Sequence, residues 1–285
     1  MASKPLFAFF GTPKFSVHVL DALERQGMLP AVVITAPDRP QGRGLMLTSS
    51  PAKQWAMERD IDVLTPEKLK DEDFLAELQN TQWDVFLVAA YAKLIPKNIL
   101  EMPRRGSLNV HPSLLPKFRG PSPALSAILA DERATGVTIM QMAEKMDAGP
   151  IVAQARIELE EEAWPPKGSE FETLLATEGG NLLAETLPHW ISGQIDAEPQ
   201  DESQATFTRK FTDADSLIDL HGDAREQLLK IRTFDKNPRA HFIQNDKRII
   251  ITEAQIRDGK LELLKVIPEG KKEIPYADFA RTLSN

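Results

Sequence analysis

The chain has 285 residues, of which 42% are hydrophobic and 27% are charged, and its formal net charge at pH 7 is −8. This is the composition of a globular protein with room for one large or two modest domains. Cysteine is absent, which excludes disulfides and thiolate chemistry. No apolar stretch approaches the roughly 18 residues of a membrane span, and the run at 6–10 is too short for a signal peptide. We therefore expect a soluble, cytoplasmic monomer with no membrane partner.

The charge is unevenly distributed along the chain. Residues 1–202 carry 19 Lys and Arg against 29 Asp and Glu, whereas residues 203–285 carry 15 against 13. An acidic body with a mildly basic C-terminal part argues against broad, non-specific affinity for nucleic acids. It does not exclude RNA binding, because phosphate contacts need only a local basic surface.

Apolar runs that alternate with helical patterns occupy the first two thirds of the chain. In chain order we predict a strand at 6–10, a helix at 14–26, a strand at 31–35, a helix at 51–59, strands at 85–90, 107–110 and 136–142, and a long helix at 171–191. Fully apolar strands that alternate with helices are typical of a Rossmann-like, mostly parallel α/β sheet with helices on both faces. Such sheets bind ligands at the carboxyl ends of their strands.

The pattern changes after Gly193. Residues 194–206 are polar, as expected of a linker. A helix at 224–233 and three short strands, at 241–244, 248–252 and 261–266, follow, with the turn signals Asn245-Asp246 and Asp258-Gly259 between them. We therefore predict a larger α/β domain over 1–193, a linker over 194–207 and a small β-rich domain over 208–285.

Asn109 and His111 stand at the end of the strand predicted at 107–110. Their spacing places both side chains on one face, so they would project together into a cleft at the carboxyl end of the strand. An amide and an imidazole can both hydrogen-bond a carbonyl oxygen that gains negative charge, and histidine also moves protons near neutral pH. The alternative for His111 is an ordinary hydrogen-bonded loop histidine. The four prolines that stiffen the next loop, at 112, 116, 121 and 123, favour the catalytic interpretation.

Two other segments carry candidate functional side chains. Asp147 precedes a Gly-Pro turn after an apolar strand, where it could orient His111 or accept a proton, or else organise only its own Asx turn. The loop at 37–44, PDRPQGRG, presents Arg39 and Arg43 among Gly and Pro. That composition suits phosphate contact, although an ordinary surface loop has the same features.

The patterns of three common kinds of site are missing. No G-x-G-x-x-G follows the first strand, and no phosphate-binding G-x-x-x-x-G-K-[ST] occurs, so a nicotinamide, flavin or P-loop site lacks support. The five histidines have no metal-ligand spacing, and we predict no metal.

Together these segments resemble the folate-dependent formyltransferases. The shared motifs are F-x-G-T-P-x-F at 9–15, N-x-H with S-L-L-P-x-x-R-G at 109–120, and D-x-G-P at 147–150. Three features resemble the methionyl-tRNA formyltransferases among them: the loop at 37–44, residues 119–123 followed by 133–140, and the linker at 199–206. The resemblance covers most of residues 5–235.

The sequence departs from the family pattern at several positions. Leu45 and Met46 stand where lysines are usual, and Tyr91-Ala92 stands in place of Tyr-Gly. Ala143 and Lys145 replace the usual Asp and Gly before the family's catalytic aspartate. The family's second domain resembles a five-stranded OB-fold, but only about fifty residues follow Pro238 here, so we expect a reduced OB-like domain.

The resemblance implies transfer of the formyl group of 10-formyltetrahydrofolate to the α-amino group of initiator methionyl-tRNA, for translation initiation. It implies that Asn109 and His111 stabilise the oxyanion, and that Asp147 holds His111 and helps to remove the proton of the amine. It assigns folate contacts to Ala90, Tyr91, Ser113, Leu114, Leu115 and Pro116. It assigns tRNA contacts to Arg39, Arg43, Lys210, Arg239, Lys247 and Arg248.

Two alternatives remain open. The Asn-His-Asp set is shared by the whole superfamily, so it indicates formyl transfer better than it indicates the acceptor. A formyltransferase that acts on a nucleotide-sugar or another small amine would share it. A non-catalytic RNA-binding protein that kept the fold is the other alternative, suggested by the altered residues 143 and 145.

Overall fold

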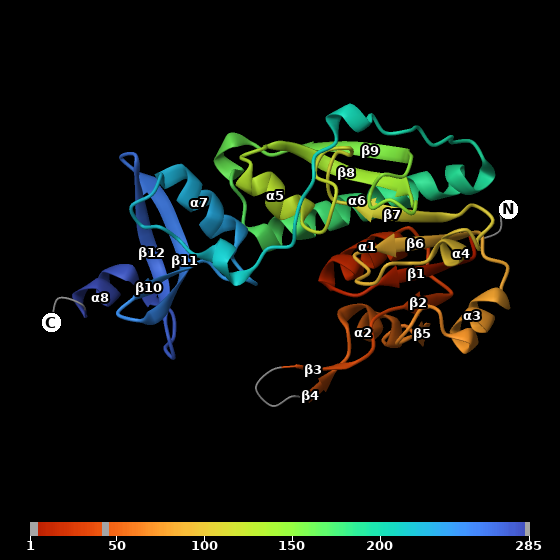
Figure 1. Cartoon of the computed structure of the whole chain (residues 1–285), viewed down its shortest axis with the longest axis horizontal. Coiled ribbons are helices and arrows are strands. Elements are labelled where there is room, and N and C mark those ends of the chain that lie inside the picture. The colour runs from red at the N-terminus through yellow and green to blue at the C-terminus, as the bar shows by residue number, and fades with distance from the viewer. Residues whose placement is uncertain (1–4, 42–45, 283–285) are drawn as a thin grey trace. The chain divides into compact units, whose positions relative to one another are not determined.

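A computed structural model of the chain describes residues 5–41 and 46–282, which group into two compact units (Figure 1). The first unit comprises residues 1–120, 136–157 and 173–207, and the second comprises residues 121–135, 158–172 and 208–285. The second unit thus combines the C-terminal part of the chain with two segments from its middle.

A seven-stranded sheet forms the core of the first unit, in the order β5-β2-β1-β6-β7-β8-β9. The strands are β1 (Phe7–Gly11), β2 (Val32–Ile34), β5 (Asp62–Leu64), β6 (Val85–Ala89), β7 (Ser107–His111), β8 (Ala134–Gln141) and β9 (Ile151–Glu158). The first five are parallel, and β8 pairs antiparallel with β7. When the five parallel strands are numbered along the chain, their order across the sheet is 3-2-1-4-5, which confirms the predicted Rossmann-like fold.

Alternate residues of the central strands face opposite layers of helices. Phe7 and Phe9 pack in one hydrophobic cluster with α1, α2 and α6, whereas Ala8 and Phe10 pack in another with α3 and α4. These helices are α1 (Lys14–Arg25), α2 (Pro51–Met57), α3 (Glu72–Gln79), α4 (Lys97–Leu100) and α6 (Gly168–Ser192). Because both faces are covered, the strands β1, β2 and β6 carry no polar side chain, which is the pattern that the sequence shows.

The second unit is built on a four-stranded sheet, β10-β11-β12-β13, in which neighbouring strands are antiparallel. Its elements are α5 (Pro123–Leu129), α7 (Ala224–Thr233), β10 (His241–Gln244), β11 (Lys247–Arg257), β12 (Lys260–Pro268), β13 (Ile274–Pro275) and α8 (Tyr276–Arg281). The pairs Asn245-Asp246 and Asp258-Gly259 have positive φ, as type I′ hairpin turns require. Both predicted turns are therefore confirmed, and β13 adds a fourth strand to the three predicted.

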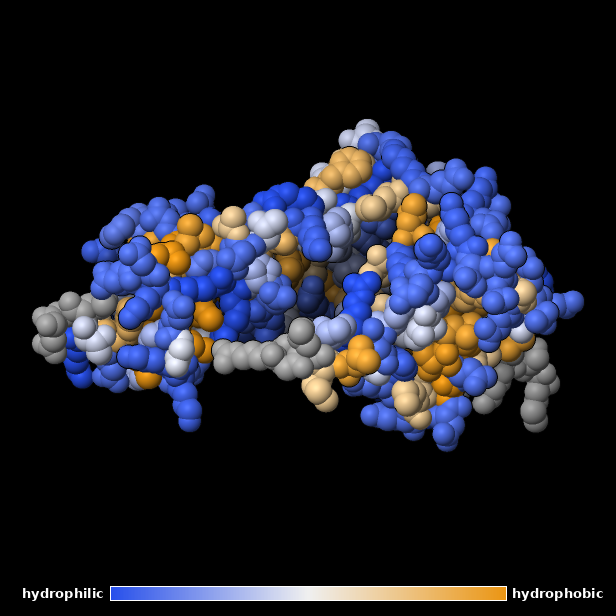
Figure 2. All heavy atoms as spheres, turned by 60° about the horizontal axis from the view of Figure 1, so that its bottom comes forward, coloured by the Kyte–Doolittle hydropathy of each residue, from blue (hydrophilic) through white to orange (hydrophobic). Residues whose placement is uncertain are grey.

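Short elements complete the described chain. The strands β3 (Arg39–Gln41) and β4 (Met46–Thr48) form a small antiparallel hairpin, and single turns of 3₁₀ helix occur at Glu161–Ala163, Glu202–Gln204 and Asp213–Ser216. Within residues 5–41 and 46–282, no helix combines the length and the apolar character that a membrane span needs. Hydrophilic side chains dominate the face shown in Figure 2, with apolar ones scattered among them.

Candidate active site

The carboxyl ends of β1 and β6 form the topological switch point of the sheet. These strands are neighbours in the sheet, and the chain leaves them toward opposite edges, to β2 and to β7. In open α/β sheets, the crevice at such a switch point binds ligands. Thr12 follows β1 here, and Ala90 and Tyr91 follow β6, while His111 ends the neighbouring β7.

Two buried hydroxyls at these strand ends have no partner in the described part of the chain. They are Oγ1 of Thr12 and Oη of Tyr91. A buried hydroxyl without a hydrogen bond is destabilising by about 1–3 kcal/mol, and such groups are usually bonded to protein or ordered water, so these two are candidates for a partner that binds at the strand ends. Burial raises the pKa of Tyr91 to about 12, which keeps this phenol protonated and able to donate at neutral pH.

A serine of α1 fixes the end of β1 against the end of β6. The Ser16 hydroxyl accepts from the backbone N–H of Thr12 at 2.9 Å and donates to the carbonyl of Ala89 at 2.7 Å. A Cβ on Gly11 would lie 2.6 Å from a ring carbon of Phe9 and 2.7 Å from Ser16, so only glycine fits. The Gly-Thr-Pro segment therefore makes a tight strand end that presents Thr12.

Asn109 and His111 project from the same face of β7. The intervening Leu108 and Val110 are buried in the hydrophobic cluster that includes α1, α2 and α6, so the period of two turns Asn109 and His111 the other way. Asn109 is half-buried, and no hydrogen bond of its carboxamide occurs among residues 5–41 and 46–282. This carboxamide is therefore free to bind a substrate.

The two nitrogens of the His111 ring face different neighbours. Nε2 lies 3.0 Å from the carbonyl oxygen of Phe118, which can only accept, so Nε2 carries the proton of the neutral ring. Nδ1 lies 3.8 Å from Oδ2 of Asp147, beyond hydrogen-bond distance. Burial lowers the pKa of His111, and the Asp147 charge and the Phe118 carbonyl act in the opposite direction. The neutral ring thus directs an unprotonated Nδ1 toward Asp147.

Asp147 sits in a turn that few residues could form. Its φ is +50°, in the left-handed region, and its Oδ2 accepts the backbone N–H of Gly120 at 2.7 Å. Two residues on, a Cβ on Gly149 would come within 1.7 Å of the carbonyl oxygen of Gln141, so the turn requires glycine there. The D-x-G-P motif therefore brings the Asp147 carboxylate to the loop that follows His111.

The residues predicted to contact the folate differ in how deeply they are buried. Ser113 and Leu115 are buried, and their carbonyls accept hydrogen bonds from the side chains of Thr138, at 2.6 Å, and Gln154, at 2.9 Å. Leu114 and Pro116 are half-buried, and Ala90 is exposed. The folate contacts of all these residues stay a prediction. In such contacts, the loop after His111 would contribute mainly apolar surface.

The segment treated above as a linker makes contacts that the sequence alone did not predict. Thr206 bonds the loop after His111 twice: its hydroxyl accepts the N–H of Phe118 at 2.8 Å, and its carbonyl accepts the N–H of Arg119 at 2.8 Å. Gln200 donates to the carbonyls of Asp147 and Gly149. The one signal in the sequence was the likeness of residues 199–206 to the formyltransferase linker.

The basic residues predicted to contact tRNA differ in exposure and in ion pairing. Arg39 on β3, Lys210 and Lys247 are exposed, and Arg239 is half-buried. Arg248 forms an ion pair with Asp213 at 2.7 Å, which reduces its availability to a phosphate. Arg43 lies outside the described residues.

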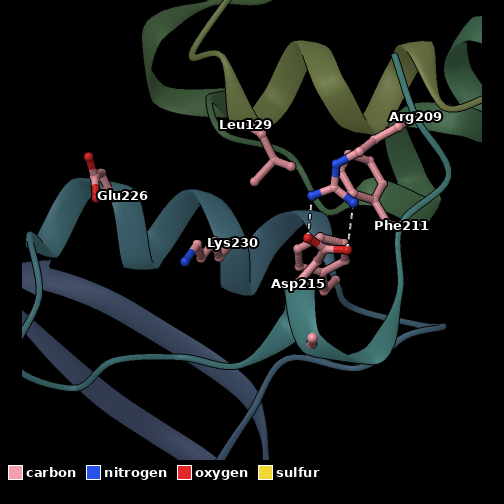
Figure 3. Close-up of a pocket in the computed structure, with 8 residues that line it drawn as sticks. Leu129, Arg209, Phe211, Asp215, Glu226 and Lys230 are labelled. Carbon is pink, nitrogen blue, oxygen red and sulfur yellow. Dashed lines mark hydrogen bonds and ion pairs between the residues drawn. The ribbon is translucent and has the colours of Figure 1, made fainter.

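A pocket of about 410 Å³ lies in the second unit (Figure 3). It is lined by Leu129, Arg209, Phe211, Ala214, Asp215, Glu226, Lys230 and Phe234. The Arg209 guanidinium points at the Asp215 carboxylate and bonds both of its oxygens. Two cations are thus matched by two carboxylates, so the pocket offers a phosphate no net attraction.

No group of three or more His, Asp or Glu side chains that could hold a metal ion occurs in the part of the chain that the structure describes.

Comparison with known proteins assigns the family. The family described as "Formyl transferase" matches residues 4–166. A methionyl-tRNA formyltransferase of Chloroflexus aggregans is 41% identical over 249 residues, which is 87% of this chain and 79% of that protein. One of Roseiflexus castenholzii is 38% identical over 298 residues, covering 96% and 94%. The solved methionyl-tRNA formyltransferase of Clostridium thermocellum shares the fold, with a TM-score of 0.62 at 15% identity over 93% of this chain and 98% of that one. The chain belongs to the formyl transferase family, among the methionyl-tRNA formyltransferases.

Proposed function

We propose that this protein transfers the formyl group of 10-formyltetrahydrofolate to the α-amino group of initiator methionyl-tRNA, for translation initiation in the cytoplasm. The observation that supports the proposal is the approach of Asp147 to His111, which shares one face of β7 with Asn109, in a chain with this family membership.

Asn109 and His111 act on the formyl group in different ways. The free carboxamide of Asn109 donates to the formyl oxygen as it gains negative charge. Nδ1 of the neutral His111 accepts the proton that the α-amine loses as its nitrogen bonds to the formyl carbon. The proton then passes to N10 of the departing tetrahydrofolate as the C–N10 bond breaks.

Asp147 supports the charged state of His111. Its carboxylate, 3.8 Å from Nδ1, stabilises the imidazolium that forms between the two proton transfers. The bond from Gly120 N–H holds Oδ2 in place.

We infer that the folate donor binds at the carboxyl ends of β1 and β6. A pterin has polar edges and flat apolar faces, and the orphan hydroxyls of Thr12 and Tyr91 provide partners for such edges. The half-buried Leu114 and Pro116 provide apolar surface for its faces. The folate supplies the activated formyl group when it is bound, and these residues would orient it.

The acceptor distinguishes this proposal from its alternative, a formyltransferase for a nucleotide-sugar or another small amine. Arg39, Lys210 and Lys247 are exposed cations that suit the RNA backbone, and both relatives named above are methionyl-tRNA formyltransferases. A small amine would need none of these cations.

The test is transfer of labelled formyl from 10-formyltetrahydrofolate to charged initiator tRNA, beside uncharged tRNA and free methionine. Label on methionyl-tRNA alone, with a rate at limiting tRNA that falls as salt rises, is the expected result. Folate binding without label on the tRNA, together with salt-insensitive transfer to a small amine, would establish the alternative.

A further inference from the structure

We propose that Gln200 is a positioning residue that holds the Asp147 turn in its working conformation, an inference that rests on the proposed function. Gln200 lies 53 residues from Asp147 along the chain. It is not among the residues predicted to contact the folate or the tRNA. Its side chain bonds the turn at one end and a buried arginine at the other.

The Gln200 carboxamide uses all of its hydrogen-bonding capacity. Nε2 donates to the carbonyl of Asp147 at 2.9 Å and to that of Gly149 at 2.7 Å. Oε1 accepts from Nε of Arg119 at 3.0 Å and from Nη2 at 2.8 Å. Two donors and two acceptor positions are a full set for a primary amide, so the amide orientation is determined.

Arg119 anchors the other end of this contact. Only 1% of Arg119 is exposed, and its Nη2 also donates to Glu202 at 2.6 Å, which Lys145 bonds at 2.8 Å. The two cations lower the pKa of Glu202 to about 2, so this carboxylate stays charged at any pH near neutrality. Since Arg119 directly precedes Gly120, Gln200 ties together the two backbone segments that meet at the Asp147 carboxylate.

The Asp147 turn needs such support. A non-glycine residue at a φ of +50° is strained by on the order of 1 kcal/mol, and such conformations persist only where the surroundings over-determine them. Without the Gln200 donors, the carbonyls of Asp147 and Gly149 would lose these partners. Rotation of the Asp147 peptide would then carry its carboxylate away from Gly120 N–H and from His111.

The kinetic test compares Gln200→Ala and Gln200→Glu with Gln204→Ala. Gln204 is the matched control, because it lies in the same segment and bonds only Asp201 within the described chain. Both Gln200 variants should lower kcat by about 10- to 100-fold while KM for each substrate stays within about twofold, since small misplacements of a catalytic group have effects of this size. Gln200→Glu keeps the acceptor for Arg119 but cannot donate to the carbonyls, so it separates the two halves of the contact. A wild-type kcat in both variants would overturn the proposal.

A double-variant comparison asks whether Gln200 acts through Asp147. In an Asp147→Asn background, adding Gln200→Ala should lower kcat by less than about threefold, because the group it positions is already disabled. An undiminished loss would show a general structural role and contradict the proposal.

A third measurement does not depend on turnover. The Gly120 amide donates to Asp147, so its hydrogen exchange should be at least about tenfold faster in Gln200→Ala than in Gln204→Ala. Unchanged exchange would refute the positioning role even if the acceptor proved to be a different amine. Wild-type protein that transfers no formyl to methionyl-tRNA, yet shows this exchange difference, would overturn the proposed function alone.

Discussion

Nδ1 of His111 and Oδ2 of Asp147 face each other across 3.8 Å, and side-chain exposures of only 5% and 15% shield this gap from water. The distance is too long for a hydrogen bond and short enough for a strong charge interaction once the ring is protonated. With Nε2 committed to the Phe118 carbonyl, Nδ1 is the nitrogen left for a substrate proton. The pair therefore suits a histidine that is neutral in the free enzyme and protonated only between the two proton transfers.

Replacement of His111 by alanine should lower kcat by about 10²- to 10⁴-fold, the usual range for loss of a general acid–base group. The fold should survive, as judged by circular dichroism and thermal unfolding. His189→Ala is a matched control, because that exposed residue lies in the last turn of α6 and its side chain bonds only Gln194 within the described chain. Near-normal turnover in His111→Ala would mean that the proton acceptor has been misassigned.

In the pH profile of kcat, His111 should add no acid limb of its own above pH 6.5, beyond the limb that protonation of the substrate α-amine produces near pH 8. Burial lowers the pKa of His111 below its ordinary value of about 6.5, so the ring stays neutral and able to accept a proton in mildly acidic solution. A second acid limb above pH 7 in single-turnover measurements, present in wild type and absent from His111→Gln, would contradict this assignment.

The same shift predicts a pH dependence of stability. The unfolded chain binds a proton at His111 below about pH 6.5, whereas the folded chain binds it only at lower pH, so this residue's contribution to stability falls as pH drops through that window. Urea unfolding should therefore show the stability difference between wild type and His111→Gln narrowing from pH 7.5 to pH 5.5. A difference that widened over this range would show that the folded state, not the unfolded one, favours the proton.

Tyr91→Phe should separate stability from ligand binding. The Tyr91 hydroxyl is buried without a partner in the described chain, so its removal should leave the free energy of unfolding unchanged or slightly increased. The dissociation constant of the folate donor should rise by roughly tenfold, because a hydrogen bond to the ligand is lost. Equal folate affinity in both proteins, measured by calorimetry, would remove Tyr91 from the donor site.

Lys247 and Arg248 offer a comparison of adjacent cations. Lys247 is exposed and has no ion pair within the described residues, whereas Arg248 is paired with Asp213. Lys247→Ala should weaken tRNA binding and reduce the slope of log affinity against log salt by about 1, and Arg248→Ala should change both less. The reverse order would indicate that the Arg248–Asp213 pair opens on binding.

Several features of the site were predictable because they depend on local chemistry. Asn109 and His111 share a face since β-strands have a period of two, and a strand apolar throughout ends at Gly11 since the next residues are Thr and Pro. The motif residues drew attention to Asp147, but the sequence could not give its distance from His111. That distance depends on the left-handed turn and on Gly120, 27 residues away.

Several short helices and strands were not predicted from the sequence. The missed elements, apart from β13, each span eight residues or fewer, too short for a clear periodicity. They are α3, α4, α5, α8, β3, β4, β5 and β9. The two-residue strand β13 exists only because Val266 and Lys265 of β12 provide a partner edge.

The sequence by itself determined the main apolar strands and the longer helices, the positions of the hairpin turns and the residue types of the predicted catalytic set, because these follow from periodicity, turn propensity and side-chain type. The tertiary structure decided which polar groups support that set. Gln200 lies in a polar stretch with no periodicity, and only the close approach of segments more than 50 residues apart turns it from a linker residue into a partner of the Asp147 turn. Contacts of this kind depend on the whole packed chain, since no local preference encodes them.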